Sequence, residues 1–415
     1  MSVETISVVG LGYIGLPTAA VAAGSGLKVI GVDVNSDAVV TINQGKIHIV
    51  EPDLEDLVKK VVDSGRLVAR TKPEKADAFL IAVPTPFKGK NHEPDLSYIE
   101  SAAKGVAAVL EKGNIVILES TSPVGATEQM SRWMAEERPD LTFPHQVEES
   151  VGSDILVAHC PERVLPGQVI RELVENDRII GGLNDQSTRA ASSVYKLFVT
   201  KGHCVETNAR TAEMSKLTEN AFRDVNIAFA NELSLICDKQ GIDVWELIAL
   251  ANRHPRVDIL QPGCGVGGHC ISVDPWFIVN QNPDTARLIH TSRKTNDFKP
   301  LFVSEQIEKA AAEFDTPCIA CLGLAFKPDI DDLRESPALA IVLNLVEKGY
   351  RVLAVEPNVA SLPAALASHP NVRLVSKADA CNQAHVIVCL VKHKAFFDIR
   401  ELVSGNRKLL DFVNL

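Results

Sequence analysis

A glycine-rich turn near the N-terminus constrains the fold of this chain more than any other segment. Gly10, Gly12 and Gly15 follow the β-branched run Ile6–Val9 and precede a stretch with helical spacing. In a strand-turn-helix unit the first glycine permits the tight turn, the second lets backbone approach a diphosphate, and the third lets helix and strand pack closely. The diphosphate then lies against N–H groups at the helix N-terminus. The spacing therefore predicts a dinucleotide-binding unit.

Asp33 indicates which dinucleotide this unit binds. It lies eighteen residues after Gly15, at the end of the next β-branched run. A carboxylate at that place accepts hydrogen bonds from ribose hydroxyls and repels a 2′-phosphate. We therefore expect NAD rather than NADP, held by Asp33 and by the turn residues Gly10, Gly12, Tyr13, Ile14 and Gly15.

The first third of the chain alternates short β-branched runs with helical patterns. The runs are Ile6–Val9, Val29–Val32, Phe79–Val83 and Ile115–Leu118. Such alternation predicts a parallel sheet with helices on both faces. A Rossmann-like domain over residues 1–206 follows from it.

The pattern changes near Thr207. The stretch from Thr211 to Asp238 contains neither Pro nor Gly and predicts one long helix. A shorter helix is expected at Val244–Asn252, before a loop rich in Gly and Pro. Strand-like runs return at Cys318–Leu324, Val352–Val355 and Val386–Leu390. We therefore expect an α/β fold with two Rossmann-like, doubly wound domains joined by a long central helix, with a central helical region at 207–312 and the second domain at 313–415.

Composition narrows the function classes. The chain has 415 residues and a net charge of −11, which argues against a general nucleic-acid binder. The N-terminus has no secretory signal and no run is long enough to span a membrane. The nine cysteines are scattered, and the Cys318-x-x-Cys321 pair lies in an apolar run that suits a buried strand better than a metal or redox site. We expect a cytoplasmic protein without a bound metal.

A second glycine-rich segment carries a cysteine. Gly265, Gly267 and Gly268 precede Cys270, and Asp274 follows four residues later. Glycines ahead of a thiol can let backbone N–H groups face a developing oxyanion. Asp274 could then act as a base or orient a water. The segment is also typical of a glycine-rich turn with an incidental buried cysteine.

One face of the long helix favours the chemical interpretation. Lys216, Asn220 and Arg223 stand at positions i, i+4 and i+7, so they share a face. A solvated charged face has the same spacing. Together with a dinucleotide site and a candidate thiol, however, the face suits a site that binds an anionic substrate and stabilises an alkoxide.

The second α/β domain has no glycine fingerprint at its first strand. Gly323 is followed instead by a segment containing Lys327, and Arg334 comes soon after. The domain is either a structural duplicate or the holder of a different ligand through Lys327 and Arg334. Composition alone does not separate these alternatives.

With these motifs in place, the whole chain resembles the UDP-glucose/GDP-mannose dehydrogenase family. The resemblance rests on ordered motifs at compatible spacing: Val83–Phe87, Glu119–Gly125, Cys160–Gly167, Glu213–Asn220, Gly267–Cys270, and Phe326–Pro328 with Arg334–Ser336. It implies that residues 1–206 bind NAD, that 207–312 carry the catalytic cysteine and the dimer contacts, and that 313–415 bind a UDP-sugar.

The resemblance also implies residue roles. Cys270 is the implied nucleophile, with Lys216 and Asn220 near the reacting oxygen, Asp274 aiding proton transfer, and Glu162 near the hydrolytic water. Thr85, Thr121, Thr127 and Arg334 are implied at the cofactor. The implied contacts to the nucleotide sugar are Arg163, Val164, Lys216, Asn220, Arg223, His254, Arg256, Gly267 and Lys327.

Departures from the family pattern bear on the sugar. Val273 precedes Asp274 where oxidisers of UDP-glucose usually carry Lys, and His269 precedes Cys270. With the Asn252–Arg256 segment, these residues favour an N-acetylated sugar, and we expect UDP-N-acetyl-D-mannosamine. UDP-N-acetylglucosamine and UDP-glucose remain alternatives. Cys264 stands where close relatives are expected to have Pro, which bears on the rigidity of that turn.

The implied reaction is a four-electron oxidation of the C6 hydroxymethyl group to a carboxylate, supplying a surface polysaccharide. A thiol is needed because covalent capture keeps the intermediate aldehyde from escaping before the second oxidation. Short-chain epimerase or dehydratase chemistry requires Tyr-x-x-x-Lys, which none of the four tyrosines provides. A non-catalytic NAD-binding sensor is the remaining alternative, and it leaves Cys270, Lys216 and Asn220 unexplained.

Assembly is the last expectation. The second half of the long helix offers apolar residues, namely Ile227, Phe229, Ala230, Leu233 and Ile236. A helix that presents more apolar surface than one core covers favours a subunit partner. We expect a homodimer, and the resemblance implies that Arg256 reaches into the partner's substrate site.

Overall fold

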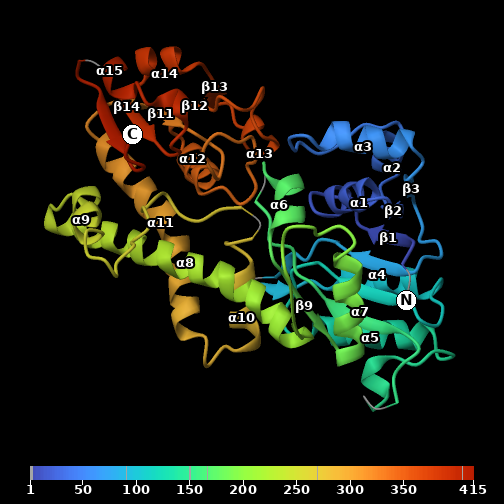
Figure 1. Cartoon of the computed structure of the whole chain (residues 1–415). Coiled ribbons are helices and arrows are strands. Elements are labelled where there is room, and N and C mark those ends of the chain that lie inside the picture. The colour runs from blue at the N-terminus through green and yellow to red at the C-terminus, as the bar shows by residue number, and fades with distance from the viewer. Residues whose placement is uncertain (1–2, 90, 149–150, 166, 269, 404) are drawn as a thin grey trace. The chain divides into compact units, whose positions relative to one another are not determined.

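The computed structural model describes residues 3–89, 91–148, 151–165, 167–268, 270–403 and 405–415. Its contacts group the chain into two compact units, Met1–Thr218 and Glu219–Leu415. The boundary falls inside the long helix α8 (Ala209–Gln240), drawn in yellow-green in Figure 1. Each unit has its own sheet and its own hydrophobic core.

The sheet of the first unit has the strand order of a dinucleotide-binding fold. Its strands are β1 (Thr5–Val9), β2 (Lys28–Val32), β3 (Leu67–Arg70), β4 (Ala78–Ile81), β7 (Ile115–Leu118), β8 (Leu156–His159), β9 (Arg178–Gly182) and β10 (Cys204–Asn208). They lie in the order β3-β2-β1-β4-β7-β8-β9-β10. Strands β3 to β8 therefore follow the doubly wound order, with the first strand at the centre. The β8–β9 pair is antiparallel, whereas the other neighbouring pairs are parallel.

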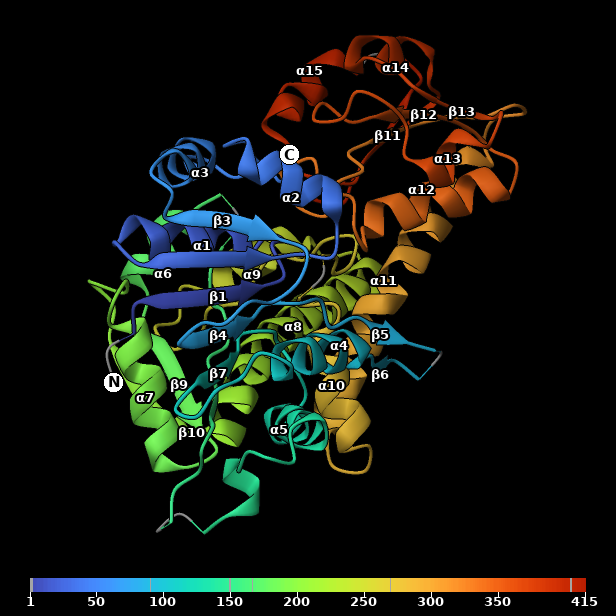
Figure 2. The same ribbon diagram turned by 90° about the vertical axis from the view of Figure 1, so that its right-hand side faces the viewer.

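Helices cover both faces of this sheet. One hydrophobic cluster joins the sheet to α1 (Gly15–Gly24), α2 (Ser36–Asn43), α3 (Leu54–Asp63), α6 (Val169–Glu175) and α7 (Asp185–Tyr195). A separate cluster joins it to α4 (Ser97–Ala107) and α5 (Ala126–Glu137). The turn η1 (Pro144–Gln146) follows α5, and the hairpin β5–β6 (Phe87–Lys88 and Glu93–Pro94) extends from the sheet in Figure 2.

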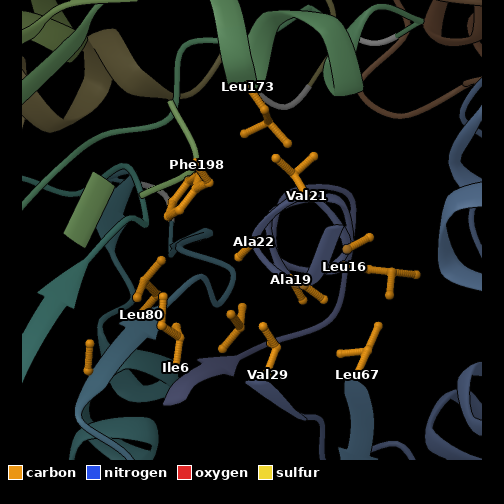
Figure 3. Packing of buried hydrophobic residues seen from close by; sticks show 14 of the residues in the cluster. Ile6, Leu16, Ala19, Val21, Ala22, Val29, Leu67, Leu80, Leu173 and Phe198 are labelled. Carbon is orange, nitrogen blue, oxygen red and sulfur yellow. The ribbon is translucent and has the colours of Figure 1, made fainter. Parts of the chain in front are cut away.

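Helix α1 lies in the middle of the first cluster because both of its sides are apolar. Ala19 and Ala22 face the strands that carry Ile6 and Val29, and Val21 faces Leu173 of α6 (Figure 3). Small alanine side chains let the helix axis approach the sheet closely. This close approach brings the start of α1 to the carboxyl end of β1, where the glycine turn lies.

The second unit contains the rest of α8 and a smaller parallel sheet. Its strands are β11 (Cys318–Leu322), β12 (Arg351–Val355), β13 (Val372–Leu374), β14 (Val386–Cys389) and β15 (Lys408–Asp411), in the order β13-β12-β11-β14-β15. Its helices are α9 (Val244–Ala251), α10 (Asp274–Gln281), α11 (Arg287–Ala311), α12 (Pro337–Glu347), α13 (Ala364–Ala367), α14 (Lys377–Gln383) and α15 (Ile399–Leu402), with the turn η2 (Lys394–Phe396). The Rossmann-like strand order thus occurs a second time.

A backbone device at the end of the first strand is repeated in both sheets. In the first unit the Gly10 N–H donates to the Val32 carbonyl at 2.8 Å, and the Leu11 N–H donates to Asp33 Oδ2 at 2.8 Å. In the second unit the Gly323 N–H donates to the Val355 carbonyl at 2.8 Å, and the Leu324 N–H donates to Glu356 Oε2 at 2.7 Å. The second α/β domain is therefore a structural duplicate of the first at this turn.

The duplicate differs in what surrounds its acid. The buried ring of His393 contacts Glu356, with 3.1 Å between His393 Nε2 and Glu356 Oε2. Burial raises the pKa of Glu356, but the hydrogen bonds from His393 and from the backbone N–H groups of Leu324 and Ala325 outweigh it and hold that pKa below its ordinary value. The carboxylate of Glu356 therefore makes its hydrogen bonds within the fold.

The expected fold is confirmed. The predicted long helix is two residues longer at each end. The seven predicted strand runs form strands, at Ile6, Val29, Phe79, Ile115, Cys318, Val352 and Val386. Cys318 and Cys321 are buried in β11, as expected of a strand. One expectation is wrong: Ala230 is fully buried and offers no surface to a partner. Within the described residues, the helices are too short or too polar to cross a membrane.

Candidate active site

The glycine turn has the geometry that its sequence predicts. Gly10 has a φ of +92°, and a Cβ on it would lie 2.5 Å from the Ala82 carbonyl oxygen. A Cβ on Gly15 would overlap the Gly10 carbonyl oxygen. A Cβ on Gly12 would meet no atom within 4 Å, so this side of the turn is open. Gly10 and Gly15 are required by the fold, and Gly12 leaves room for a ligand.

The start of α1 suits an anionic group. No side chain caps this helix, and its first turn contains no acidic residue. Tyr13 is exposed and Ile14 is half-buried at the helix N-cap. Asp33 is fixed at the end of β2 because its two oxygens accept from the Leu11 and Asn35 N–H groups, at 2.8 and 2.9 Å. The residues present therefore fit a dinucleotide diphosphate and ribose.

Two of the three predicted cofactor threonines are linked by a hydrogen bond. The Thr85 hydroxyl donates to the Thr121 carbonyl at 2.5 Å, which joins the loops after β4 and β7. Both threonines are half-buried. These loops follow neighbouring parallel strands at the carboxyl edge of the sheet, which is where ligands of doubly wound folds bind.

The third threonine has a buried partner that the sequence analysis did not single out. Thr127 lies in the first turn of α5, and its hydroxyl donates to Glu213 Oε1 at 2.6 Å. The same carboxylate accepts from the Thr127 and Gly125 N–H groups at 2.8 and 2.7 Å. Glu213 therefore caps α5 and ties it to the start of α8. Burial raises its pKa against the effect of these hydrogen bonds. An acid on a helix otherwise lined with polar residues gives no sequence signal of this role.

Glu162 is a buried carboxylate with a defined orientation. Its Oε1 accepts from the Arg163 N–H at 2.5 Å, and its Oε2 accepts from Arg178 Nη1 at 2.5 Å. The Arg163 side chain turns toward the Asp177 carbonyl at 3.3 Å, and Val164 packs against the core. Arg178 was not predicted, because an arginine that begins a strand looks like an edge charge until the fold buries it.

The cysteine loop (residues 263–268 and 270–271) packs tightly on the segment that carries Lys327 and Arg334. A Cβ on Gly267 would lie 2.5 Å from the Glu335 carbonyl oxygen, and one on Gly268 would lie 2.8 Å from the Phe326 ring. These glycines are required for close packing. The Gly268 N–H donates to the Arg334 carbonyl at 3.2 Å, so this N–H group is hydrogen-bonded within the fold.

Cys270, Asp274 and Asn220 are brought together. The Asp274 N–H donates to the Cys270 carbonyl at 2.8 Å, because one helical turn separates them at the start of α10. Asp274 is buried, and its Oδ2 accepts from Asn220 Nδ2 at 2.5 Å. Cys270 is half-buried. His269 lies outside the described residues. The structure thus joins the thiol-bearing turn to α8 through an amide–carboxylate contact.

The other predicted residues of α8 share the face of Asn220. Lys216 is half-buried one turn before it, and Arg223 is exposed almost one turn after it. His254 and Arg256 follow α9 and are exposed, with 3.3 Å between the Arg256 N–H and His254 Nδ1. Lys327 is exposed, and Arg334 pairs with Asp332 at 2.6 Å.

Both ends of the cysteine loop are fixed by a buried polar network between α8 and α11. Asn231 Oδ1 accepts from the Gly263 N–H at 2.9 Å, and Arg293 Nη1 reaches the Ile271 carbonyl at 3.5 Å. Asn296 connects Asn231 to Arg293. It bonds to Asn231 at 2.9 Å and to Asp224 at 2.8 Å, and Asp224 pairs with Arg293. This network was missed because its members lie far apart in sequence.

Three family models match the chain in succession. The models describe the NAD binding domain, the central domain and the UDP binding domain of the UDP-glucose/GDP-mannose dehydrogenase family, and they match residues 4–199, 210–298 and 320–415. The chain belongs to this family. It is an oxidoreductase with NAD as its acceptor, as expected. The ranges that we assign to the domains remain a prediction.

Curated relatives and solved structures narrow the likeness further. A UDP-N-acetyl-D-mannosamine dehydrogenase of Campylobacter jejuni is 64% identical over 396 residues, which cover 95% of this chain and 97% of the relative. An NDP-N-acetyl-D-galactosaminuronic acid dehydrogenase of Ralstonia nicotianae is 63% identical and covers 95% of this chain and 92% of its own length. A UDP-D-ManNAc dehydrogenase structure from Pyrococcus horikoshii has a TM-score of 0.86 at 38% identity, covering 99% of this chain and 95% of that one.

Proposed function

We propose that this chain oxidises the C6 hydroxymethyl group of UDP-N-acetyl-D-mannosamine to a carboxylate, in the cytoplasm, for a surface polysaccharide. The observation that carries the chemistry is the contact of Asn220 with Asp274, directly after Cys270. The names of relatives at 60–64% identity support the sugar. The N-acetylated sugar also agrees with Val273 at the position before Asp274.

In the proposed mechanism the glycine turn would bind two NAD molecules in succession, and each would accept one hydride. Lys216 and Asn220 stabilise the C6 oxygen while it loses its proton and becomes a carbonyl. The Cys270 thiolate then adds to the aldehyde carbon and forms a thiohemiacetal. Loss of the second hydride and of the hydroxyl proton leaves a thioester. Water cleaves its C–S bond, the acid forms, and the thiol returns.

The remaining predicted residues divide between proton transfer and binding. Asp274 accepts or relays the proton of the C6 oxygen through its contact with Asn220, and Glu162 orients the hydrolytic water. Thr85, Thr121, Thr127 and Arg334 are proposed at NAD. The nucleotide sugar is proposed to contact Arg163, Val164, Arg223, His254, Arg256, Gly267 and Lys327, whose cations match a diphosphate.

A second sugar has specific support. The relative named for N-acetyl-D-galactosaminuronic acid is 63% identical, almost as similar as those named for N-acetyl-D-mannosamine. The two N-acetylated sugars differ in stereochemistry and not in the chemistry at C6. The test is therefore a panel of the UDP-sugars of N-acetylmannosamine, N-acetylgalactosamine, N-acetylglucosamine and glucose, with NADH formation and sugar acid both measured. Two NADH per acid are expected, and highest kcat/KM on any sugar other than N-acetylmannosamine would overturn the assignment.

We also propose that the protein is a homodimer. Phe222, Phe229 and Ile236 stand seven residues apart on α8, and their exposed fractions are 68%, 53% and 43%. Side chains at this spacing form one stripe along a helix. An exposed apolar stripe of this kind favours a protein partner, and a second copy of α8 supplies a matching one. The stripe includes two of the apolar residues expected from sequence, together with Phe222.

A further inference from the structure

Behind Glu162 lies a second buried carboxyl group that the proposed mechanism does not use. Glu119 follows β7, and Tyr195 ends α7. Together with Arg178 of β9 and Cys160 after β8, they form a cluster in the interior of the first unit, with each member at most 6% exposed. All of these residues lie within residues 1–218, so the cluster belongs to one compact unit.

Two hydrogen-bonded pairs make up the cluster. Arg178 Nη1 donates to Glu162 Oε2 at 2.5 Å, and the Tyr195 hydroxyl donates to Glu119 Oε1 at 2.6 Å. The Arg178 guanidinium carbon lies 5.6 Å from the centre of the Tyr195 ring. The cation therefore contacts both pairs. Its hydrogen bonds go to Glu162 and, from Nη2, to the Leu173 carbonyl at 3.2 Å.

One cation serves two carboxyl groups in this interior. Among the described residues, Glu119 Oε2 has no hydrogen-bond partner, and neither has Arg178 Nε. An ionised carboxylate with a buried, unsatisfied oxygen is strongly disfavoured, and two carboxylates near each other disfavour double ionisation. Burial and the neighbouring Glu162 raise the pKa of Glu119 to about 7. Burial also raises the pKa values of the Cys160 thiol and the Tyr195 phenol, so both of these groups stay neutral.

We propose that Glu119 is a positioning residue that holds a proton, so that the Arg178 guanidinium stays bonded to Glu162 and fixes its orientation. This inference rests on the proposed role of Glu162 in thioester hydrolysis. While Glu119 is neutral, the guanidinium is committed to Glu162. Once Glu119 ionises, two carboxylates compete for one guanidinium, the orientation of Glu162 is lost, and hydrolysis slows.

The first test follows the proton directly and does not need turnover. Infrared spectra of the whole protein, titrated from about pH 5 to about pH 9, detect the carbonyl band of a protonated buried carboxyl. The wild type should lose this band with a midpoint near neutrality, and Glu119→Gln should lack it. In Glu162→Gln the midpoint should fall by about one pH unit or more, because the competitor for Arg178 is gone. An unchanged midpoint in Glu162→Gln, or no such band in the wild type, overturns the proposal.

The second test measures hydrolysis. In single-turnover experiments with substrate and NAD, decay of the Cys270 thioester should slow several-fold above neutral pH in the wild type and should stay flat in Glu119→Gln. Tyr195→Phe should shift the slowing to higher pH, because the lost hydrogen bond favours the carboxylate form of Glu119. Ser192→Ala, which removes a buried hydroxyl from the same helix, is the matched control and should keep the wild-type profile.

The two tests separate the inference from the proposed function. If Glu162→Gln hydrolyses the thioester as fast as the wild type, the proposed role of Glu162 is wrong, and the infrared midpoints still decide whether Glu119 holds the proton. If Glu119→Gln slows hydrolysis equally at every pH, with the wild-type profile preserved, Glu119 is only a packing residue and the proposal is overturned.

Discussion

Arg293 and Asp224 form a buried ion pair, with 2.6 Å between Nη1 and Oδ1, next to the carbonyl of Ile271, the residue that follows Cys270. The side chains are at most 2% exposed. Burial raises the pKa of Asp224 against the attraction of Arg293, so the pair is maintained at some cost in desolvation. Its position suggests that the pair fixes the cysteine loop rather than adding much net stability.

Removing one partner of this pair should therefore strongly destabilise the folded protein. Asp224→Ala removes the buried partner of the Arg293 guanidinium and leaves it only the half-exposed Asp297, so the free energy of unfolding should fall by about 3 kcal/mol. Urea denaturation measures it. The exposed pair Lys59–Asp63 is the control, and Asp63→Ala should change stability by less than about 1 kcal/mol. A loss of similar size in both variants would contradict the importance of burial.

Cys270→Ser tests the nucleophile. A hydroxyl is a far weaker nucleophile than a thiolate at neutral pH, so capture of the aldehyde should fail and acid formation should drop by orders of magnitude. Calorimetry should show that NAD and the nucleotide sugar still bind. Cys264→Ser is the matched control in the same loop and should keep turnover. Near-normal acid production by Cys270→Ser would remove this residue from the mechanism.

Gly12 and Gly15 should respond differently to the same added methyl group. In Gly15→Ala the Cβ overlaps the Gly10 carbonyl, so thermal unfolding should shift to markedly lower temperature. In Gly12→Ala the Cβ meets only open space, so stability should be nearly unchanged while NAD binding weakens at least several-fold. Comparing unfolding curves with NAD titrations separates the two. Equal loss of stability in both variants would show that Gly12 is structural.

The homodimer predicts complementation between two inactive variants. Arg256→Ala and Cys270→Ser should each be inactive, and a mixed dimer should regain one intact site if Arg256 serves the partner's substrate. Turnover after subunit exchange measures this, with heterodimer formation checked by native mass spectrometry. No recovery in proven heterodimers would place Arg256 in the site of its own subunit.

Glu119 also predicts a pH dependence of stability. Its pKa is raised to about 7 in the folded protein from 4.5, so the folded state keeps a proton that the unfolded chain loses. Stability from this group is fully present below pH 4.5 and falls as pH rises to about 7, by about 3 kcal/mol. Denaturation at several pH values should show that Glu119→Gln lacks this decline. A parallel decline in both proteins would mean that other groups cause it.

Much of the fold could be predicted because its signals are local. The glycine turn, the acid after β2 and the β-branched runs each specify a strand, turn or helix within a few residues. The antiparallel pairing of β8 with β9 could not be predicted, because such short strands carry no periodicity that fixes their direction. Ala230 was misplaced because a small apolar residue suits a core and a surface equally well.

In the candidate site, too, some residues could be predicted from local signals and others could not. Cys270, Asp274 and Asn220 could be chosen because their residue types and spacing carry chemistry. Glu213, Arg178 and Asn231 could not, because each acts on a partner far away in sequence, and only burial makes an ordinary charge or amide informative. Long-range polar contacts are therefore the part of this site that requires a structure.

The repeated turn at Gly323 and Glu356 has a consequence for the ancestry of the chain. The two halves share a strand order and the same backbone hydrogen bonds at this turn. Duplication of one ancestral nucleotide-binding half produces this pattern. In the second half, His393 contacts the carboxylate of Glu356, which stands where a dinucleotide-binding domain has the acid that binds a ribose. Divergence has therefore kept the backbone hydrogen bonds of this turn, while the acid now bonds to a histidine instead of a ligand. An acid after a second strand is not sufficient evidence of a dinucleotide site.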